Sequence, residues 1–158
     1  MLRVVLYQPD IPQNTGNVAR TCASAGAELH LVRPFGFRWF GAAAAGDPRL
    51  KRAGLDYWPH VRHVLHDSWE KFVEGLEPGA RVWAFSSKAQ QPYTAVAYQP
   101  GDYLLFGPET RGLPDDVLRQ FPAVTIPMPG PVRSLNLSVA VGIGLFEALR
   151  QLGVSGEG

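Results

Sequence analysis

Short apolar runs that suit β-strands alternate along the chain with segments that suit helices, and this order constrains the fold more than any other feature. It is typical of α/β proteins, in which helices cover both faces of a mostly parallel sheet. The expected strands cover residues 2–7, 29–32, 61–65, 81–86, 102–106 and 123–126. The expected helices cover residues 14–25, 49–53, 68–75, 114–121 and 135–152. Because the 158 residues contain no repeat or linker, we expect one domain over 1–152 and a flexible tail over 153–158.

The composition favours a compact chain and argues against several other classes. Hydrophobic residues make up 46% of the sequence and charged residues 18%, a balance unlike that of disordered proteins. No apolar run approaches the ~20 residues that a membrane-spanning helix needs. The first residues lack the features of a signal peptide, and Cys22, the sole cysteine, cannot form an intrachain disulfide. We therefore expect a cytoplasmic protein without a membrane partner.

The charges are unevenly distributed, although the net charge is only +1. From Arg33 to Arg62 there are six basic residues and only two aspartates. This surplus could follow a phosphate backbone or form an ordinary solvated face, and the residues alone favour neither reading. The four tryptophans and five tyrosines could stack on bases, but aromatic residues in a chain of this size mostly fill the core.

The first of three candidate clusters covers residues 9–17, between the first expected strand and the first helix. Open α/β sheets bind ligands at such strand ends. Asn14 or Thr15 is suited to cap the helix, and Gly26 to end it. Helical spacing places Arg20 on a polar stripe, which favours a ligand-facing role over that of an ordinary surface arginine. The stripe also holds Asn17, Thr21 and Ser24, while Val18, Cys22 and Ala25 lie opposite.

The second and third clusters follow later strands. Residues 104–114 contain Glu109, a carboxylate just beyond a buried strand, and two glycines that permit tight turns or close approach of a ligand. Residues 126–138 contain three prolines that stiffen a loop, and Ser134 is suited to cap the last helix. Taken singly, the second cluster could be a plain turn and the third a plain helix cap.

Other constellations of residues are missing or incomplete. The chain lacks the phosphate-binding pattern G-x-x-x-x-G-K-[ST], the dinucleotide pattern G-x-G-x-x-G and the nucleophile pattern G-x-S-x-G. His60, His63 and His66 have no cysteine or carboxylate partners at zinc-site spacing, so no metal is expected. Cys22 lies in a helix and is interpreted as a small buried residue.

Together, the three clusters resemble the SPOUT (α/β-knot) RNA methyltransferases, and more closely their TrmL-like branch, the tRNA (cytidine/uridine) wobble 2′-O-methyltransferases. The resemblance is carried by residues 11–20, 53–57, 103–114 and 126–138. It implies a fold whose C-terminal segment threads a loop to form a trefoil knot. Two departures stand out: an apparent insertion at Gly41–Asp47, and Ser86-Ser87-Lys88 where Thr-Thr-Lys is common.

The resemblance implies that S-adenosylmethionine is the cofactor and that it lies in the knot against three loops. By this resemblance its contacts, most of them through the backbone, are Phe85, Gly107, Ile126 and Ser134. The implied catalytic group is Arg20, oriented by Asn14, with Glu109 and Asn136 shaping the pocket. Because a guanidinium essentially never loses its proton, we expect Arg20 to bind a phosphate and stabilise a developing alkoxide rather than act as a base.

The implied reaction is methyl transfer to the ribose 2′-hydroxyl of the wobble cytidine or uridine in a tRNA anticodon loop, with leucine tRNAs as the implied substrates. No metal is required. Two alternatives stay open: a related SPOUT enzyme that acts on ribosomal RNA, and a non-catalytic module that only binds RNA. The presence of Arg20, Glu109, Ser134 and Asn136 argues against the second alternative.

The last helix is expected to be apolar on two sides. One stripe holds Leu135, Val139, Ile143, Phe146 and Leu149, and the other holds Leu137, Val141, Leu145 and Ala148. A helix with two apolar faces must be covered twice, and few other helices are available in this chain. The sequence therefore predicts a homodimer, and the family resemblance implies that RNA bound by one subunit is presented to the partner's cofactor. A position of Arg20 beside the partner's knot is the hypothesis that follows.

Overall fold

A computed structural model of the protein describes residues 1–39 and 58–153. Its centre is a six-stranded sheet in the order β3-β2-β1-β5-β4-β6, and all five strand pairs within the described residues are parallel. The strands are β1 (Arg3–Tyr7), β2 (Glu28–Val32), β3 (His63–His66), β4 (Val82–Phe85), β5 (Tyr103–Phe106) and β6 (Ala123–Val124). The α-helices are α1 (Pro12–Ala25), α3 (Trp69–Glu74), α4 (Asp115–Leu118) and α5 (Leu137–Gln151). The predicted α/β class is confirmed.

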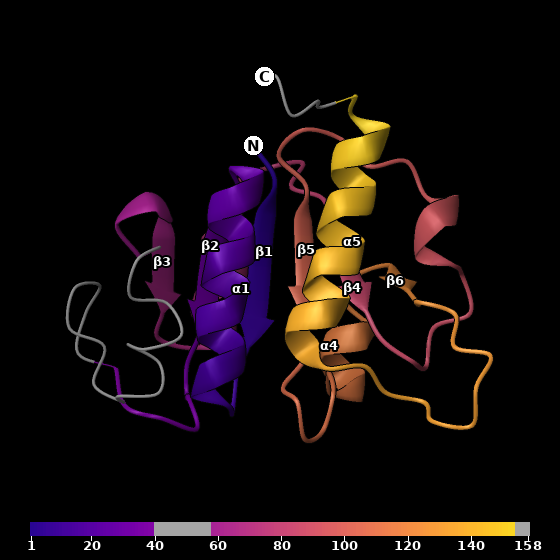
Figure 1. The fold of residues 1–158 in the computed structure, drawn as a ribbon. Coiled ribbons are helices and arrows are strands. Elements are labelled where there is room, and N and C mark those ends of the chain that lie inside the picture. Colours follow the sequence, from indigo (N-terminus) through magenta and orange to yellow (C-terminus); the bar gives the residue numbers. More distant parts are fainter. Residues whose placement is uncertain (40–57, 154–158) are drawn as a thin grey trace.

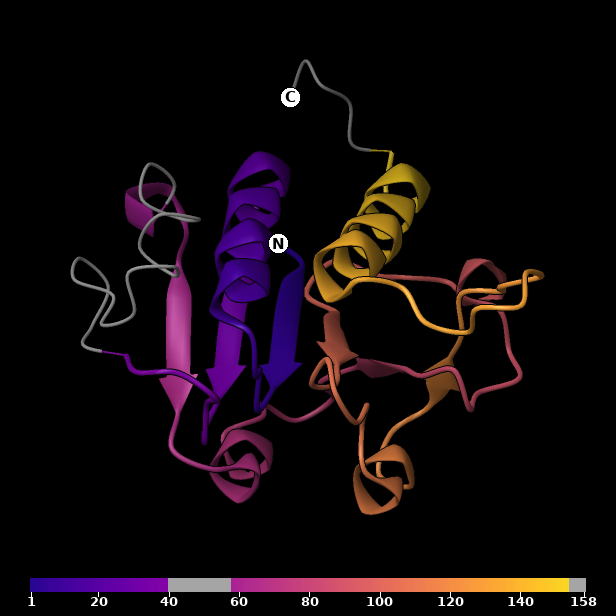
Figure 2. The ribbon, with the colours of Figure 1, turned by 60° about the horizontal axis from the view of Figure 1, so that its bottom comes forward.

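Helices cover both faces of the sheet. Helices α1 and α5 lie side by side on one face, and α3 and α4 lie on the other (Figures 1 and 2). Because every strand is parallel to its neighbours, the carboxyl ends of all strands lie at one edge of the sheet. The loops that leave this edge are those that hold the three clusters.

Each face of the sheet has its own core, as the alternation of side chains in β1 illustrates. Val4 and Leu6 point toward α1 and α5, whereas Val5 points toward α3 and α4. The first core is completed by residues that include Val18, Cys22, Val141 and Leu145. The second is completed by Trp69, Phe72, Leu105 and Val117, among others. Burial in the first core raises the pKa of the Cys22 thiol to about 12, which suits the small buried residue that was expected.

Helix α1 begins earlier than predicted and lacks the predicted cap. It starts at Pro12, and the preceding Ile11 makes no capping hydrogen bond with its side chain. Asn14 and Thr15 lie inside the first turn and are buried. Pro12 suits this start because the first helical position needs no N–H donor and proline fixes a helical φ. The predicted end is confirmed, since Gly26 closes the helix with a left-handed φ of 66°.

Helix α5 is also capped by a different residue from the one predicted. Its cap is Asn136, whose side-chain oxygen accepts a hydrogen bond from the Ser138 N–H at 2.9 Å. Ser134 lies two residues too early to reach that N–H group, so its prediction as the cap was wrong. This correction leaves the Ser134 hydroxyl available to the neighbouring pocket.

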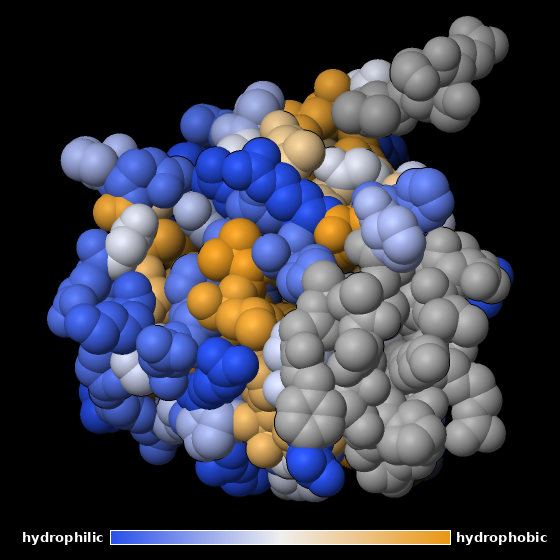
Figure 3. All heavy atoms as spheres, turned by 90° about the vertical axis from the view of Figure 1, so that its left-hand side faces the viewer, coloured by the Kyte–Doolittle hydropathy of each residue, from blue (hydrophilic) through white to orange (hydrophobic). Residues whose placement is uncertain are grey.

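Two short 3-10 helices, η1 (Trp58–His60) and η2 (Tyr93–Ala95), were not predicted from sequence. The expected helix at 49–53, the Gly41–Asp47 insertion and most of the tail lie outside the described residues. Strand β3 is an edge strand, and its four residues are half-buried. On this side of the molecule, apolar side chains gather among hydrophilic ones (Figure 3). Within 1–39 and 58–153, no helix has both the length and the apolar character needed to cross a membrane.

Candidate functional site

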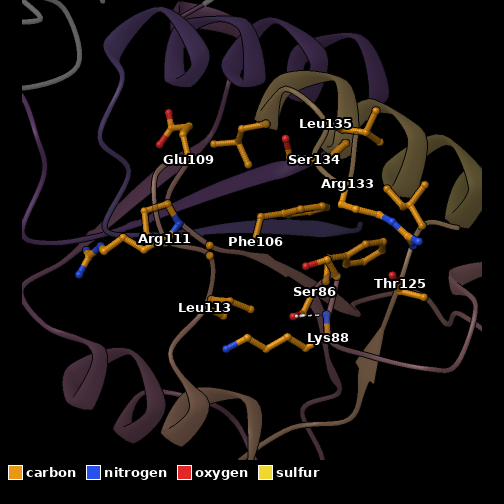
Figure 4. A pocket seen from close by; sticks show the side chains of 18 of the residues that line it. Ser86, Lys88, Phe106, Glu109, Arg111, Leu113, Thr125, Arg133, Ser134 and Leu135 are labelled. Atoms are coloured by element: carbon orange, nitrogen blue, oxygen red, sulfur yellow. Dashed lines mark hydrogen bonds between the residues drawn. The ribbon is translucent and has the colours of Figure 1, made fainter. Parts of the chain in front are cut away.

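A pocket of about 310 Å³ lies at the carboxyl ends of β4, β5 and β6. Its lining draws on three loops that are far apart in sequence: 85–88, 106–113 and 125–135 (Figure 4). The structure brings five of the predicted site residues into this lining: Phe85, Gly107, Glu109, Ile126 and Ser134. The volume is within the range of small-ligand pockets, roughly 300–1,000 Å³.

The apolar part of the lining is built around a pair of stacked rings. Phe85 and Phe106 lie with their ring centroids 4.5 Å apart and their planes 21° from parallel. Gly144 of α5 makes room for this pair, because a Cβ at that position would lie 2.8 Å from the Phe85 ring. A glycine in the last helix therefore allows the helix to pass close over the aromatic floor of the pocket.

Of the two uses expected of Gly107, a tight turn and close approach of a ligand, the structure shows the tight turn. A Cβ at Gly107 would lie 2.4 Å from the Leu113 nitrogen and 2.5 Å from the Gly112 carbonyl carbon. The space that a side chain would fill is thus taken by the loop's own backbone. Gly107 allows the 108–112 turn to fold back on itself, and this turn forms one wall of the pocket.

The Glu109 side chain binds the start of α1. Oε1 accepts a hydrogen bond from the Asp10 N–H at 2.9 Å, and Oε2 accepts one from the Ile11 N–H at 3.1 Å and one from Asn14 Nδ2 at 3.2 Å. A carboxylate in this position satisfies backbone donors and interacts favourably with the helix dipole. Glu109 thereby binds the two residues that precede α1 and one side chain of the first helical turn.

Asn14 and Asn136 extend this network to the third cluster. Asn136 Nδ2 donates to Asn14 Oδ1 at 3.0 Å, while Asn136 Oδ1 accepts from the backbone and hydroxyl of Ser138. Both polar atoms of the Asn14 amide are therefore used by Glu109 and Asn136. These bonds join the first predicted cluster to the second and third, which lie 95 and 122 positions further along the chain at the bonded residues.

Arg20 lies elsewhere on the protomer. It is an exposed residue of α1 and does not belong to the pocket lining. It follows Asn14 by six positions, so the two Cα atoms are separated by about 9 Å along the helix axis. The hydrogen bonds of the described residues link Asn14 to Glu109 and Asn136, and none links it to Arg20. The expected polar stripe is present, since Asn17 and Ser24 are also exposed.

Two more contacts fasten the loop after β1 to the 108–112 turn. Thr110 Oγ1 donates to Asp10 Oδ2 at 2.5 Å, and the Arg111 guanidinium donates to Gln8 Oε1 at 3.0 Å. Gln8 has a φ of 45°, a left-handed conformation that is unusual for a residue other than glycine. Backbone strain of this kind is often kept next to functional sites.

Sequence reasoning did not single out three cations of the lining: Lys88, Arg111 and Arg133. Lys88 Nζ lies 3.0 Å from Asp115 Oδ1, and the hydrogen bond and charge of the ammonium lower the pKa of that carboxyl. Lys88 and Arg111 each follow a strand end closely, and this position could have indicated both. Arg133 precedes Ser134 in the proline-rich loop, where no periodic pattern marks it.

The lining suits the nucleoside cofactor that the family resemblance implies. The aromatic floor offers an apolar surface to a purine, and among the described residues the backbone N–H groups of 128–135 donate no hydrogen bond within the protein. Such groups can bind polar edges of a ligand. The described residues contain no group of three or more His, Cys, Asp or Glu side chains placed to hold a metal.

Comparison with protein families gives one match over most of the chain. Residues 1–146 match the model of the SpoU rRNA Methylase family. The chain is 47% identical to a tRNA (cytidine(34)-2′-O)-methyltransferase of Escherichia coli K12, over 99% of this chain and 97% of that protein. It is 44% identical to a protein of the same name from Saccharophagus degradans, over 99% of both chains.

Comparison with solved structures also gives matches to proteins described as acting in RNA methylation. One, described as "Structural insights into the 2-OH methylation of C/U34 on tRNA", matches with a TM-score of 0.90 and 59% identity, over 98% of this chain and 92% of that one. Another, an AdoMet-bound rRNA methyltransferase from Sinorhizobium meliloti, matches with a TM-score of 0.83 and 30% identity. The second match covers 98% of this chain and 57% of the other.

Proposed function

The chain belongs to the SpoU rRNA methylase family, and from this membership we propose that it is an S-adenosylmethionine-dependent tRNA ribose 2′-O-methyltransferase. Its target is the 2′-hydroxyl of the wobble cytidine or uridine in the anticodon loop, and its substrates include leucine tRNAs. The observation that carries the proposal is the convergence of Phe85, Gly107, Ile126 and Ser134 on one pocket. The chain is 47% and 44% identical, over nearly its full length, to two tRNA (cytidine(34)-2′-O)-methyltransferases, and this similarity supports the tRNA wobble nucleotide over a ribosomal target.

The cofactor, when bound, supplies a methyl group already activated by its sulfonium. Phe85, Phe106 and the loops around Gly107, Ile126 and Ser134 line the pocket and would hold the cofactor there. Glu109, Asn14 and Asn136 fix these loops relative to α1, so that nucleophile and methyl group can be aligned. They act as positioning residues, since their polar atoms are occupied by one another and by backbone donors.

Arg20 is the group that acts on the RNA in this mechanism. Its guanidinium binds a phosphate next to the target ribose and stabilises the negative charge that develops on the 2′-oxygen. The hydroxyl proton leaves to solvent, because a guanidinium that keeps its own proton cannot accept another. No metal is needed for any of these roles.

The active unit is a homodimer, and the exposure of α5 supports this part of the proposal. Its inward stripe is buried, whereas Leu135, Val139 and Phe146 remain 39%, 49% and 48% exposed. Exposed apolar side chains that follow one side of a helix are typical of a contact surface. The position of Arg20 outside its own pocket's lining supports a site shared between subunits. We place the reaction in the cytoplasm and propose tRNA as the partner, with no membrane involved.

The proposal is tested by transfer of a tritiated methyl group to total tRNA and, separately, to ribosomal RNA. We expect incorporation into tRNA alone and its recovery, after digestion, as 2′-O-methylated wobble nucleotide from leucine tRNAs. Transfer to ribosomal RNA would instead assign the related SPOUT activity. Binding of RNA without transfer to either substrate would indicate a non-catalytic module. The Arg20→Ala variant is the matched control, because it should bind cofactor normally and transfer no methyl group.

A further inference from the structure

The electrostatic balance of the pocket leaves one cation without a counter-charge. Among the residues of the lining, the charged side chains are Lys88, Glu109, Arg111 and Arg133. Glu109 is occupied by three N–H donors from the start of α1, and Lys88 is paired with Asp115. Arg111 is bound to the Gln8 amide and points away from the cavity (Figure 4).

Arg133 differs from these residues in both contacts and position. It is exposed, and within the described part of the chain its guanidinium has no ion pair, hydrogen bond or ring contact. Its side chain runs from beside Ser134 toward Thr125, on the opposite side of the pocket from Glu109 and Arg111 (Figure 4). The Arg133 guanidinium therefore has five unused donors, and it lines a pocket whose floor is apolar.

From this arrangement we propose that Arg133 binds the carboxylate of the amino acid tail of the cofactor. The inference rests on the proposed function, which requires a ligand with an uncharged nucleoside at one end and a zwitterionic tail at the other. The aromatic floor and free backbone groups suit the nucleoside but supply no charge for the carboxylate. Arg133 supplies that charge, and its planar fork matches a carboxylate with two parallel hydrogen bonds.

The location of Arg133 gives this contact a second consequence. The residue precedes Ser134 and Asn136, and Asn136 both caps α5 and bonds to Asn14. An ion pair between Arg133 and the ligand would fix the loop next to this network. Arg133 is thus a residue for cofactor binding and orientation, and it takes no part in the phosphate binding and charge stabilisation proposed for Arg20.

The test compares two ligands that differ in the tail alone. S-adenosylhomocysteine carries the carboxylate, and 5′-methylthioadenosine keeps the adenosine and sulfur but lacks the amino acid. Both are titrated calorimetrically into the intact protein and into Arg133→Gln, which keeps hydrogen-bond donors and loses the charge. Because charge-assisted bonds are the strong ones, we expect affinity for S-adenosylhomocysteine to fall about 10- to 100-fold. Affinity for 5′-methylthioadenosine should stay unchanged.

Arg119→Gln is the matched control, since Arg119 is also exposed but lies outside the pocket lining, at the end of α4. It should leave both affinities as they are. Arg133→Lys should lie between the intact protein and Arg133→Gln, because a point charge replaces the fork. Equal weakening of both ligands by Arg133→Gln would overturn the proposal and assign the residue to loop structure.

An unchanged affinity for S-adenosylhomocysteine would also overturn it. If that result came with a raised KM for tRNA and a salt dependence shallower by about one phosphate contact, Arg133 would be an RNA contact instead. Failure of the underlying function is distinguishable, because the unaltered protein would then bind neither adenosine ligand. Intact binding in the parent with no effect of Arg133→Gln would reject this inference alone.

Discussion

Glu109 Oε2 accepts a hydrogen bond from Asn14 Nδ2 at 3.2 Å, across 95 positions of sequence. The same carboxylate binds the backbone N–H groups of Asp10 and Ile11, so one side chain joins the turn after β5 to the first turn of α1. Glu109 therefore contributes to the site by holding two of its walls together. The first prediction follows from this contact.

Glu109→Gln should lower the free energy of unfolding by about 1–3 kcal/mol, because an amide brings N–H groups toward donors that need an acceptor. Urea unfolding followed by circular dichroism measures this change. Glu74→Gln is the control, since Glu74 is highly exposed and its one ion pair among the described residues is with Lys71 at 3.7 Å. An equal effect of the two substitutions would show that the Glu109 contact contributes nothing special.

Asn136→Ala and Ser134→Ala should separate helix capping from ligand binding. Loss of the Asn136 cap should cost about 1 kcal/mol of stability. Ser134→Ala should leave stability unchanged, because Ser134 does not cap α5, and should weaken binding of S-adenosylhomocysteine. Thermal unfolding and calorimetric titration of both variants give the comparison. Destabilisation by Ser134→Ala matching that of Asn136→Ala would contradict the capping found here.

Gly144→Ala should disturb the pocket floor, since the added Cβ would lie 2.8 Å from the Phe85 ring. Overpacking of this kind costs about 1–3 kcal/mol and should also weaken binding of adenosine ligands. Gly142→Ala is the matched substitution in the same helix, and within the protomer its Cβ would meet nothing within 4 Å. It should stabilise the helix by about 0.5–1 kcal/mol. Similar losses in both variants would rule out the Phe85 contact as the cause.

Stability should fall at mildly acidic pH because of a pair of histidines, of which His30 is buried and His66 half-buried. His30 Nδ1 and His66 Nε2 lie 2.8 Å apart, and burial lowers the pKa of both side chains despite the opposing effect of Glu28 on His30. The unfolded chain therefore takes up protons near its ordinary pKa of about 6.5 that the folded chain resists, and stability decreases as pH falls through that value. Urea unfolding between about pH 5 and 8 measures the slope. His66→Gln should make the dependence of stability on pH less steep. His60→Gln is the control, because His60 is exposed. If His66→Gln leaves the slope unchanged, the His30–His66 pair is not its cause.

Phe146→Asp should convert the proposed dimer to a monomer, because it places a charge on the exposed apolar stripe of α5. Light scattering should give about twice 17.3 kDa for the parent and 17.3 kDa for the variant. If the site is shared, mixing inactive Arg20→Ala with a Gly107→Val variant that does not bind the cofactor should restore part of the methyl transfer. A fully active monomer would refute the dimer, and a dimer without restored activity would refute only the shared site.

The strands and the main helices could be predicted because their apolar periodicity is local. Strand β2 and helix α3 begin and end within one residue of the sequence prediction. The cap of α5 could not be predicted in this way, since Asn136 competes with Ser134 from two residues away. Both residues have the right chemistry, and only the folded backbone decides which one reaches the free N–H group.

The site residues were found by resemblance, whereas their physical roles needed the structure. Gly107 was expected to permit a tight turn or the approach of a ligand, and only the structure shows that it makes room for the Gly112–Leu113 backbone. Arg133 was not singled out, because a charged residue in an irregular loop has no periodic signal. Arg133 is distinguished by the other charged side chains of the pocket lining, which are already bound to other residues. Those contacts can be seen only once the loops are folded together.

The reliance of α1 on Glu109 also has a bearing on synthesis at the ribosome. Residues 3–25 supply a central strand and a helix, but the acceptor for the Asp10 and Ile11 donors lies 99 and 98 positions further along the chain. Strand β1 likewise lacks one neighbour until β5 has emerged. Residues 3–25 of a nascent chain therefore leave the exit tunnel with open hydrogen-bonding groups, and most of the polypeptide must be translated before this region can become stable.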